Sequence, residues 1–194
     1  MPLTSRLATH HDVDELTSLM RAAIDELQKG FLDDATIKAS HAIMGLDTQL
    51  IDDGTYFVIE SESESDGTGT GGERVVGCGG WSRRATLYGG NHSAGRDAKL
   101  LDPAADAARV RAMYTRPGFT RRGVGRLILE LCEQAAADEG FTRLELMATL
   151  AGRPLYEAYG FEPVEEVVDT SSGTPIPIVR MAKPVTRPRR PANT

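Results

Sequence analysis

The chain has 194 residues, of which 40% are hydrophobic, and its formal net charge is −6. This length and composition predict a single globular domain with a sizeable core, and they exclude the fibrous and intrinsically disordered classes. The negative charge argues against general binding to nucleic acid and favours cationic partners. Because the sequence shows no signal segment and no long apolar run, we expect a cytoplasmic protein with no membrane partner.

Cysteine usage favours free thiols over a disulfide, and histidine usage gives no sign of a metal centre. Cys78 and Cys132 both lie in apolar stretches, which favours buried free thiols in a reducing compartment. His10, His11 and His41 lack the spacing of a ligand set, so we expect them at the surface or in helix caps. No metal site is expected.

The first quarter of the chain predicts one strand and two helices. Alternating residues indicate a strand at 3–9. Apolar residues at helical spacing then run from Asp12, which can cap the helix, to Gly30. A second and less regular helix is expected from about Asp33 towards Leu50.

Two strands are expected next, at 55–60 and 74–82, with a long connection between them. The connecting residues, 61–73, include no apolar side chain and predict a flexible acidic loop. The glycines of the second strand indicate a bulge or the close approach of another element.

The rest of the chain alternates strands with helices. An irregular segment at 86–107 comes first, and we expect it beside the active site. The elements expected after it are a strand at 108–115, a helix at 123–138, a strand at 141–148, a helix at 154–159, a hairpin of strands at 161–168 and 175–181, and a disordered basic tail at 184–194. This order predicts a single α/β domain over residues 3–183, with a mixed central sheet and helices on both faces.

The residues around Arg121 have the composition of an anion-binding turn. They join the strand at 108–115 to a helix that begins after Gly123, so unpaired N–H groups and the positive end of the helix dipole point into the turn. Arg121, Arg122 and Arg126 add positive charge at the same place. We therefore expect a phosphate or pyrophosphate there.

A plainer interpretation is that Gly123 and Gly125 only permit a tight turn and close helix packing, with the arginines solvated. The stretch is not a Walker loop, because no Gly-Lys-Ser/Thr follows, and it lacks the third glycine of a dinucleotide fingerprint. Three arginines interleaved with the glycines, directly after a strand, favour phosphate binding.

Two segments resemble motifs of the GNAT superfamily of acyl-coenzyme A dependent N-acetyltransferases. Residues 117–126, Pro-Gly-Phe-Thr-Arg-Arg-Gly-Val-Gly-Arg, are similar to that family's cofactor signature, Gln/Arg-x-x-Gly-x-Gly/Ala. Residues 155–161, Leu-Tyr-Glu-Ala-Tyr-Gly-Phe, are similar to its Phe/Leu-Tyr-x-x-x-Gly-Phe segment. The resemblance extends from about residue 3 to residue 183. It implies the GNAT fold, acetyl-CoA as cosubstrate, and direct attack on the acetyl group by a primary amine of a small molecule or peptide.

The resemblance also implies which residues hold the cosubstrate. The backbone of Met113, Tyr114 and Thr115 would bind the pantetheine arm. The strand would splay from its neighbour after this point, which would open a cleft and aim a backbone N–H at the thioester oxygen. The pyrophosphate would lie on Arg121, Arg122, Gly123, Val124, Gly125 and Arg126.

Three positions depart from the family's pattern. Thr120 stands where Gln or Arg is usual, and Gly152 stands where Ala is usual. Thr149 or a neighbour stands where many members carry an Asn that binds the pantetheine arm. These departures affect contacts with the cosubstrate more than the fold.

The resemblance assigns the proton transfers to two side chains. Tyr156 matches the tyrosine that protonates the departing thiolate, with packing of the short helix as the alternative role. Glu145 occupies roughly the place of a glutamate that some members use as a base, and a structural role is its alternative.

Two other functions stay open at this point. The departures at positions 120 and 149 suggest a catalytically silent module that binds or senses acyl-CoA. A phosphate-binding fold unrelated to coenzyme A is the third alternative. The negative charge makes a cationic small molecule, a polyamine or a lysine-rich peptide a suitable acceptor. The resemblance implies that loops build the acceptor site, which are here the second-helix region and the segment 86–107. We expect no nucleic-acid partner, and the sequence leaves a homodimer open.

Overall fold

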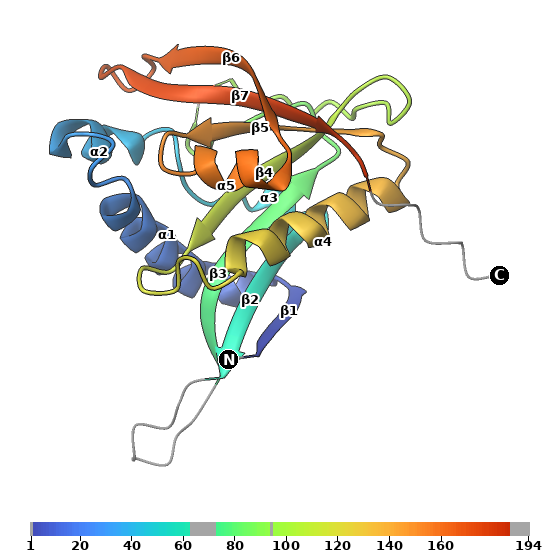
Figure 1. Cartoon of the computed structure of the whole chain (residues 1–194), viewed down its shortest axis with the longest axis horizontal. Coiled ribbons are helices and arrows are strands. Elements are labelled where there is room, and N and C mark those ends of the chain that lie inside the picture. Colours follow the sequence, from blue (N-terminus) through green and yellow to red (C-terminus); the bar gives the residue numbers. More distant parts are fainter. Residues whose placement is uncertain (1, 63–72, 94, 187–194) are drawn as a thin grey trace.

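The protein is a seven-stranded sheet with helices on both faces (Figure 1). The structure, a computed structural model, describes residues 2–62, 73–93 and 95–186. The strands are β1 (Leu3–Leu7), β2 (Tyr56–Glu62), β3 (Glu73–Ser82), β4 (Ala108–Thr115), β5 (Arg143–Thr149), β6 (Glu162–Asp169) and β7 (Ile176–Pro184). The helices are α1 (Val13–Leu27), α2 (Asp34–Ser40), α3 (Gln49–Asp52), α4 (Val124–Asp138) and α5 (Arg153–Tyr159). The predicted single mixed α/β domain is confirmed.

The strand order in the sheet is β1-β2-β3-β4-β5-β7-β6. Neighbouring strands are antiparallel except for β4 and β5, which are parallel and connected through α4. This parallel pair lies in the middle of the sheet, and the functional site is built on it.

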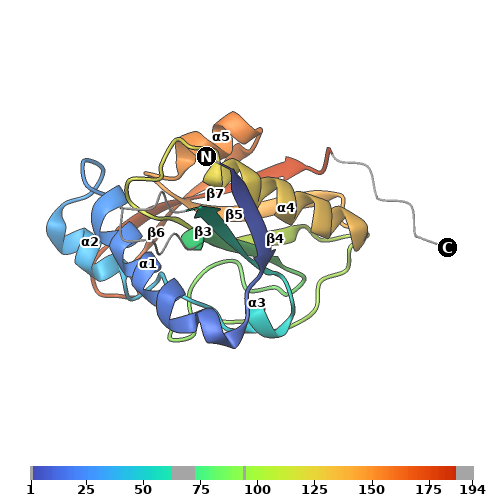
Figure 2. The ribbon, with the colours of Figure 1, turned by 90° about the horizontal axis from the view of Figure 1, so that it is seen from below.

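The helices form two layers, with α4 and α5 on one face of the sheet and α1 and α3 on the other (Figure 2). Apolar residues at helical spacing bury one side of α4, among them Val124, Ile128 and Cys132, against β3, β4 and β5. On the other face, Leu16 and Leu19 of α1 pack on the remaining side of the sheet.

Glycines in β3 allow α4 to lie close to the sheet. A Cβ on Gly77 would come within 2.3 Å of Val124, and one on Gly79 within 2.6 Å of Ile128. The β3–β4 register also shifts between Cys78 and Gly80. The glycines of β3 therefore allow the close approach of α4, one of the two expected alternatives, whereas the extra residue of the β3–β4 bulge lies on β4.

The prediction of a single helix from Asp33 towards Leu50 is wrong. α2 ends at Ser40 and α3 begins only at Gln49. Between them, Gly45 has φ 141°, and the buried carboxylate of Asp47 pairs with Arg111 at 2.7 Å. The ion pair with the buried Arg111 of β4 holds Asp47 in this non-helical segment.

Asp12 precedes α1 but makes no capping hydrogen bond to it, so this expectation is also wrong. Its carboxylate accepts from the backbone N–H of Thr9 at 2.7 Å and pairs with Arg6 at 2.7 Å. The hydrogen bond from Arg6 lowers the pKa of Asp12 to about 2.

Both ends of the expected acidic loop belong to the sheet: Ser61 and Glu62 to β2, and Glu73 to β3. The rest of that loop, 63–72, lies outside the described residues. The expected start of the tail at residue 184 needs correction, because Pro184 ends β7 and the two residues after it are hydrogen-bonded to the domain. The tail residues 187–194 lie outside the described range.

A buried carboxylate holds this end of the chain in place. Glu133 of α4 accepts from Lys183 Nζ at 2.6 Å, from Thr186 N at 2.7 Å and from the hydroxyl of Tyr159 at 2.7 Å. Burial by itself raises the pKa of Glu133, but these donors lower it to about 2. The carboxylate thus joins α4, α5 and the end of β7.

Both cysteines are buried and free, as predicted. Burial raises the pKa of Cys78 to about 12, so this thiol stays protonated and unreactive. No helix in the described part of the chain is both long enough and apolar enough to cross a membrane.

Candidate active site

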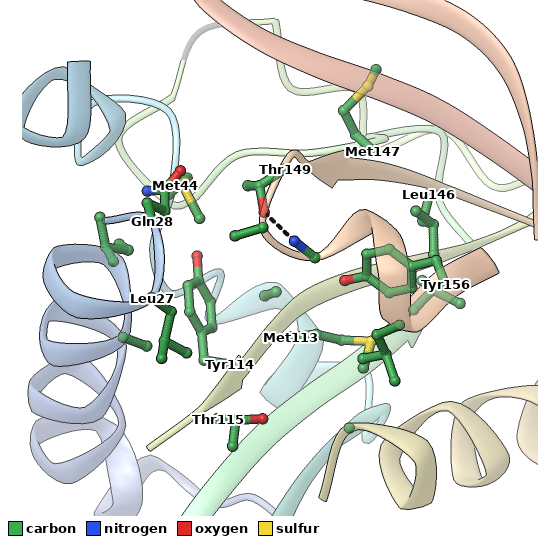
Figure 3. Close-up of a pocket in the computed structure, with 18 of the residues that line it drawn as sticks. Leu27, Gln28, Met44, Met113, Tyr114, Thr115, Leu146, Met147, Thr149 and Tyr156 are labelled. Atoms are coloured by element: carbon green, nitrogen blue, oxygen red, sulfur yellow. Dashed lines mark hydrogen bonds between the residues drawn. The ribbon is translucent and has the colours of Figure 1, made fainter. Parts of the chain in front are cut away.

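A cavity of about 610 Å³ lies where β4 and β5 separate (Figure 3). Its walls come from both layers of helices and from the sheet. They include the end of α1, the turn after α2, residues 87–89, most of β4, the start of α4, the end of β5, one side of α5, and the start of β7. The segment 86–107 contributes Leu87, Tyr88 and Gly89, which places part of it beside this cavity.

The cavity exists because β4 and β5 pair over a very short length. Two pairs, Ala108 with Leu144 and Arg109 with Glu145, are the register contacts between them in the described chain. Both strands continue well past these pairs, to Thr115 and Thr149. Along 110–115, the edge of β4 that faces β5 therefore has no strand partner among the described residues, and its backbone groups can bind an extended ligand.

A bulge in β4 lies at the start of this opening. Gly80 faces Arg111 and Cys78 faces Tyr114, so two β4 residues lie opposite a single residue of β3. Ala112 has φ 49°, in a region that residues other than glycine rarely occupy. Its carbonyl accepts from the hydroxyl of Tyr56 at 2.7 Å. The bulge turns the backbone of Ala112 and Met113 where the two strands separate.

The turn between β4 and α4 forms a concave backbone surface. Gly118, Arg121 and Gly123 have φ values of 87°, 62° and 88°. Left-handed residues interspersed with other conformations can direct successive N–H groups to one side, which is the geometry of an anion-binding nest. Gly123 immediately precedes Val124, the first residue of α4, so the helix dipole points to the same place.

The three arginines at this turn and in the first turn of α4 have different surroundings. Arg121 and Arg126 line the cavity. Arg122 is not among its lining residues, and its guanidinium lies over the ring of Phe119, 5.1 Å from the centroid. Arg126 also contacts Glu130 one turn along α4 at 3.3 Å.

Tyr156 extends from α5 into the cavity (Figure 3). Its ring packs edge-on against Phe161, with 6.0 Å between the centroids. Its hydroxyl has no hydrogen-bond partner among the described residues. Burial raises the pKa of Tyr156, so the hydroxyl is protonated at neutral pH and can act as a proton donor.

Glu145 does not reach the cavity. It lies on β5 where this strand still pairs with β4, below the opening. Its carboxylate pairs with Arg109 and, at 3.1 Å, with Arg180. The structure therefore separates Glu145 from Tyr156 and gives it the partners of a structural ion pair.

The remaining predicted residues lie around the opening. Met113, Tyr114, Thr115, Gly123, Val124 and Gly125 all line the cavity. Tyr114 is 7% exposed, and its hydroxyl accepts from the backbone N–H of Gly45 at 3.0 Å. Thr149 also lines the cavity, and its hydroxyl accepts from the N–H of Gly152 at 3.1 Å, at the start of α5.

The opposite wall of the cavity was predicted only in part: the second-helix region and the segment 86–107 do contribute to it, but the contributions of α1, β5 and β7 were not expected. It consists mainly of apolar side chains from α1, the residues that follow it, the turn after α2, β5 and β7: Leu27, Phe31, Ile43, Met44, Met147 and Ile178. Within the described residues, no histidine, aspartate or glutamate lines the cavity. No group of three or more metal-ligating side chains was found in the described parts of the chain.

Residues 52–163, more than half of the chain, match the family model of the acetyltransferase (GNAT) domain. The chain therefore belongs to the GNAT family, as the two motifs indicate. This makes it an acetyl-CoA-dependent N-acetyltransferase. No curated protein sequence matches it.

Solved structures share this fold at low sequence identity. A GCN5-related N-acetyltransferase from Rhodopseudomonas palustris is similar over 95% of this chain and 96% of its own, with 14% identity and a TM-score of 0.65. The PaiA N-acetyltransferase of Thermoplasma acidophilum, solved with coenzyme A, is similar over 95% and 99%, with 14% identity and a TM-score of 0.57. The ribosomal-protein-S18-alanine N-acetyltransferase of Escherichia coli is similar over 100% and 99%, with 14% identity and a TM-score of 0.54.

Proposed function

We propose that this protein transfers the acetyl group of acetyl-CoA directly to a primary amine, with both substrates bound in the cavity between β4 and β5. One observation carries the proposal. The concave arginine-bearing turn, the unpaired edge of β4 and the hydroxyl of Tyr156 all open into the same cavity. These are the parts that such a transfer needs: an anion site, a track for the pantetheine arm and a proton donor.

The residues present fit acetyl-CoA. The backbone N–H groups of Arg121, Gly123, Val124 and Gly125, with the side chains of Arg121 and Arg126, would hold the pyrophosphate. Arg122 contributes to the local positive potential from outside the cavity. The backbone groups of Met113, Tyr114 and Thr115 would bind the two amides of the pantetheine arm, as an added strand would. Acetyl-CoA supplies the activated acetyl group.

The bulge at Ala112 would place a backbone N–H donor near the acetyl oxygen, which gains negative charge during the transfer. Across the opening, the backbone N–H groups near the bulge have no strand partner among the described residues, so one of them can donate to this oxygen without first breaking a strand hydrogen bond. Donors fixed in advance by the fold stabilise this charge more effectively than water does.

Two protons move during the transfer. The nitrogen of the neutral amine forms a bond to the acetyl carbon, the carbon–sulfur bond breaks, and the amine's proton passes to water. Tyr156 donates its hydroxyl proton to the leaving sulfur and recovers a proton from solvent. Because Glu145 is paired with Arg109 and Arg180 away from the cavity, we do not propose it as the base.

The test measures thiol release from acetyl-CoA with a panel of primary amines, in parallel with the affinity for coenzyme A. Release that depends on an amine supports the transferase. Tight binding of coenzyme A without release for any amine would instead support the silent acyl-CoA-binding module. Absence of any thermal shift with coenzyme A would contradict both the transferase and the binding module, because a ligand at 100 times its dissociation constant stabilises the folded protein by about 2.7 kcal/mol.

A further inference from the structure

The wall of the cavity opposite the proposed acetyl-CoA site, where the amine that accepts the acetyl group would bind, is apolar. Phe31, Ile43, Met44, Met147 and Ile178 come together here from the chain after α1, the turn after α2, β5 and β7. Ile43 and Ile178 are 5% and 4% exposed, and Met44, Met147 and Tyr88 pack against them. A surface of this kind binds aryl and alkyl groups through removal of apolar area from water.

The charges around the cavity do not favour a polycation. The charged side chains among its described lining residues are Arg111, Arg121 and Arg126. Arg121 and Arg126 belong to the anion-binding turn, and the buried Arg111 is paired with Asp47 at 2.7 Å. A second ammonium group on the amine substrate would meet no carboxylate among the described lining residues. The acidic residues behind the net charge of −6 therefore lie elsewhere than on the wall of this cavity.

Gln28 is the polar exception on the apolar side. Its side chain lines the cavity although the residue is only 4% exposed. The amide nitrogen contacts the sulfur of Met44 at 3.8 Å, and the amide oxygen accepts no hydrogen bond from the described residues. This oxygen is open to the cavity and meets no donor from the described residues there, so a ligand that brings a hydroxyl or N–H group can donate a hydrogen bond to it.

Gln28 and Tyr156 lie on opposite sides of the cavity, with Tyr114 between them (Figure 3). The reacting nitrogen has to lie near Tyr156, at the opening of β4 and β5. A donor that reaches Gln28 must then be at the far end of the acceptor molecule, beyond its apolar part.

We propose that the acceptor is a small primary amine carried on an aryl or similarly bulky apolar group, with a hydrogen-bond donor at the far end that Gln28 recognises. This substrate class rests on the proposed acetyltransferase function. Gln28 is a specificity-determining residue in this proposal and takes no part in the proton transfers.

The test compares three amines at saturating acetyl-CoA: tyramine, phenethylamine, which lacks only the hydroxyl, and the polyamine spermidine. We expect kcat/KM for tyramine to exceed that for phenethylamine by about fivefold, the value of one net hydrogen bond. Phenethylamine should exceed spermidine by about tenfold or more, because it buries an aromatic ring and leaves no second charge unpaired.

Two variants separate the parts of the proposal. Gln28→Leu should remove the preference for tyramine while leaving phenethylamine unchanged or better. Ile43→Glu should lower kcat/KM for phenethylamine and raise it for spermidine. Gln134→Leu, whose amide contacts Asp138 on α4 away from the cavity, serves as the matched control and should keep the wild-type order. Melting temperature and affinity for coenzyme A confirm that each variant is folded.

Spermidine equal to or better than phenethylamine would overturn the substrate class. An unchanged tyramine preference in folded Gln28→Leu would overturn the role of Gln28. If no amine releases thiol, the transferase proposal fails, and calorimetric binding of the same amines in the presence of coenzyme A decides the inference by itself. Tighter binding of tyramine than of spermidine upholds it, and the reverse order or no binding overturns it.

Discussion

A methyl group on Gly125 would lie 2.6 Å from Cδ2 of Leu155, so α4 and α5 meet at a glycine. Gly123, by contrast, has open space around the position of a Cβ and a φ of 88°. The two glycines of the motif therefore do different things. Gly123 shapes the turn, and Gly125 sets how closely the helix that carries Tyr156 can approach the anion site.

Gly125→Ala should impair catalysis more than cosubstrate binding. The added methyl overlaps only the terminal Cδ2 of Leu155, so the Leu155 side chain has to move, and the ring of Tyr156 beside it on α5 shifts by much less than the about 1 Å that can cost about 100-fold in rate. We expect kcat to fall by about threefold while the Kd for coenzyme A stays unchanged.

The double variant Gly125→Ala/Leu155→Ala tests the cause, because shortening Leu155 removes the overlap. Its kcat should exceed that of Gly125→Ala. An unchanged kcat with a weakened Kd in Gly125→Ala would mean that Gly125 acts through the anion site instead.

Tyr156→Phe should lower kcat by about 100-fold, the usual contribution of a positioned proton donor, with little change in KM. Tyr159→Phe, on the same helix, is the matched control. The hydroxyl of Tyr159 binds Glu133 away from the cavity, so its loss should reduce stability by about 1 kcal/mol and leave kcat intact. Equal turnover in wild type and Tyr156→Phe would remove this hydroxyl from the mechanism.

Arg121→Glu and Arg122→Glu make the same charge change at adjacent positions, but only Arg121 lines the cavity. We expect Arg121→Glu to weaken coenzyme A binding by at least about tenfold, the value of a charge-assisted contact. Arg122→Glu should have a smaller effect that decreases as salt is added, because it acts through the solvent-screened potential. Titration calorimetry at two ionic strengths measures both, and equal losses would contradict the assignment.

Glu133→Gln should destabilise the protein at neutral pH by about 3–5 kcal/mol, because it leaves Lys183 buried without its carboxylate. The pKa of Glu133 is lowered to about 2 in the folded protein, so its stabilisation is present above its unfolded pKa of about 4.5 and is lost as the pH falls towards 2.

The difference in melting temperature between wild type and Glu133→Gln should therefore begin to shrink as the pH falls below about 4.5 and should largely vanish near pH 2. Glu157→Gln on α5 breaks a half-exposed pair with Arg153 and should cost less than about 1 kcal/mol. A constant difference in melting temperature from pH 7 to pH 2 would show that Glu133 acts through packing alone.

The acidic limb of the pH–rate profile should follow the acceptor, since no described carboxylate or histidine lines the cavity. Below its own pKa the amine is protonated and cannot attack. Two acceptor amines of different pKa should give acidic limbs that are displaced from each other by the difference between those pKa values. Glu145→Gln should keep the acidic limb of the wild type. Loss of the limb in that variant would restore Glu145 as a base.

The sequence predicts the parts of the site that depend on local signals. The helical period of α4, the glycines of the turn and the alternation of Leu144, Glu145 and Leu146 are all encoded within a few residues, and the corresponding elements lie close to where they were expected. The alternation correctly separates Glu145 from the two leucines. It does not reveal that Glu145 lies below the point where the strands separate, because that depends on pairing with β4.

Long-range contacts account for the errors. The segment after Ser40 has residues compatible with a helix, but the ion pair of Asp47 with Arg111, 64 residues away, fixes it as a turn. Gln28 and Ile178 come together only through the folded sheet, so no spacing in the sequence indicates the acceptor wall. The contacts of Thr186 with Glu133 similarly extend the domain beyond the expected boundary.

The short pairing of β4 with β5 also bears on the amount of protein that a cell retains. The sheet consists of two parts, β1 to β4 and β5 to β6, that share two register pairs in the described chain. A pantetheine arm bound along 110–115 would bridge these parts and stabilise the folded state in proportion to the logarithm of its concentration. Resistance to proteolysis should then rise and fall with the supply of acetyl-CoA, which would link the abundance of this protein to the metabolic state of the cell.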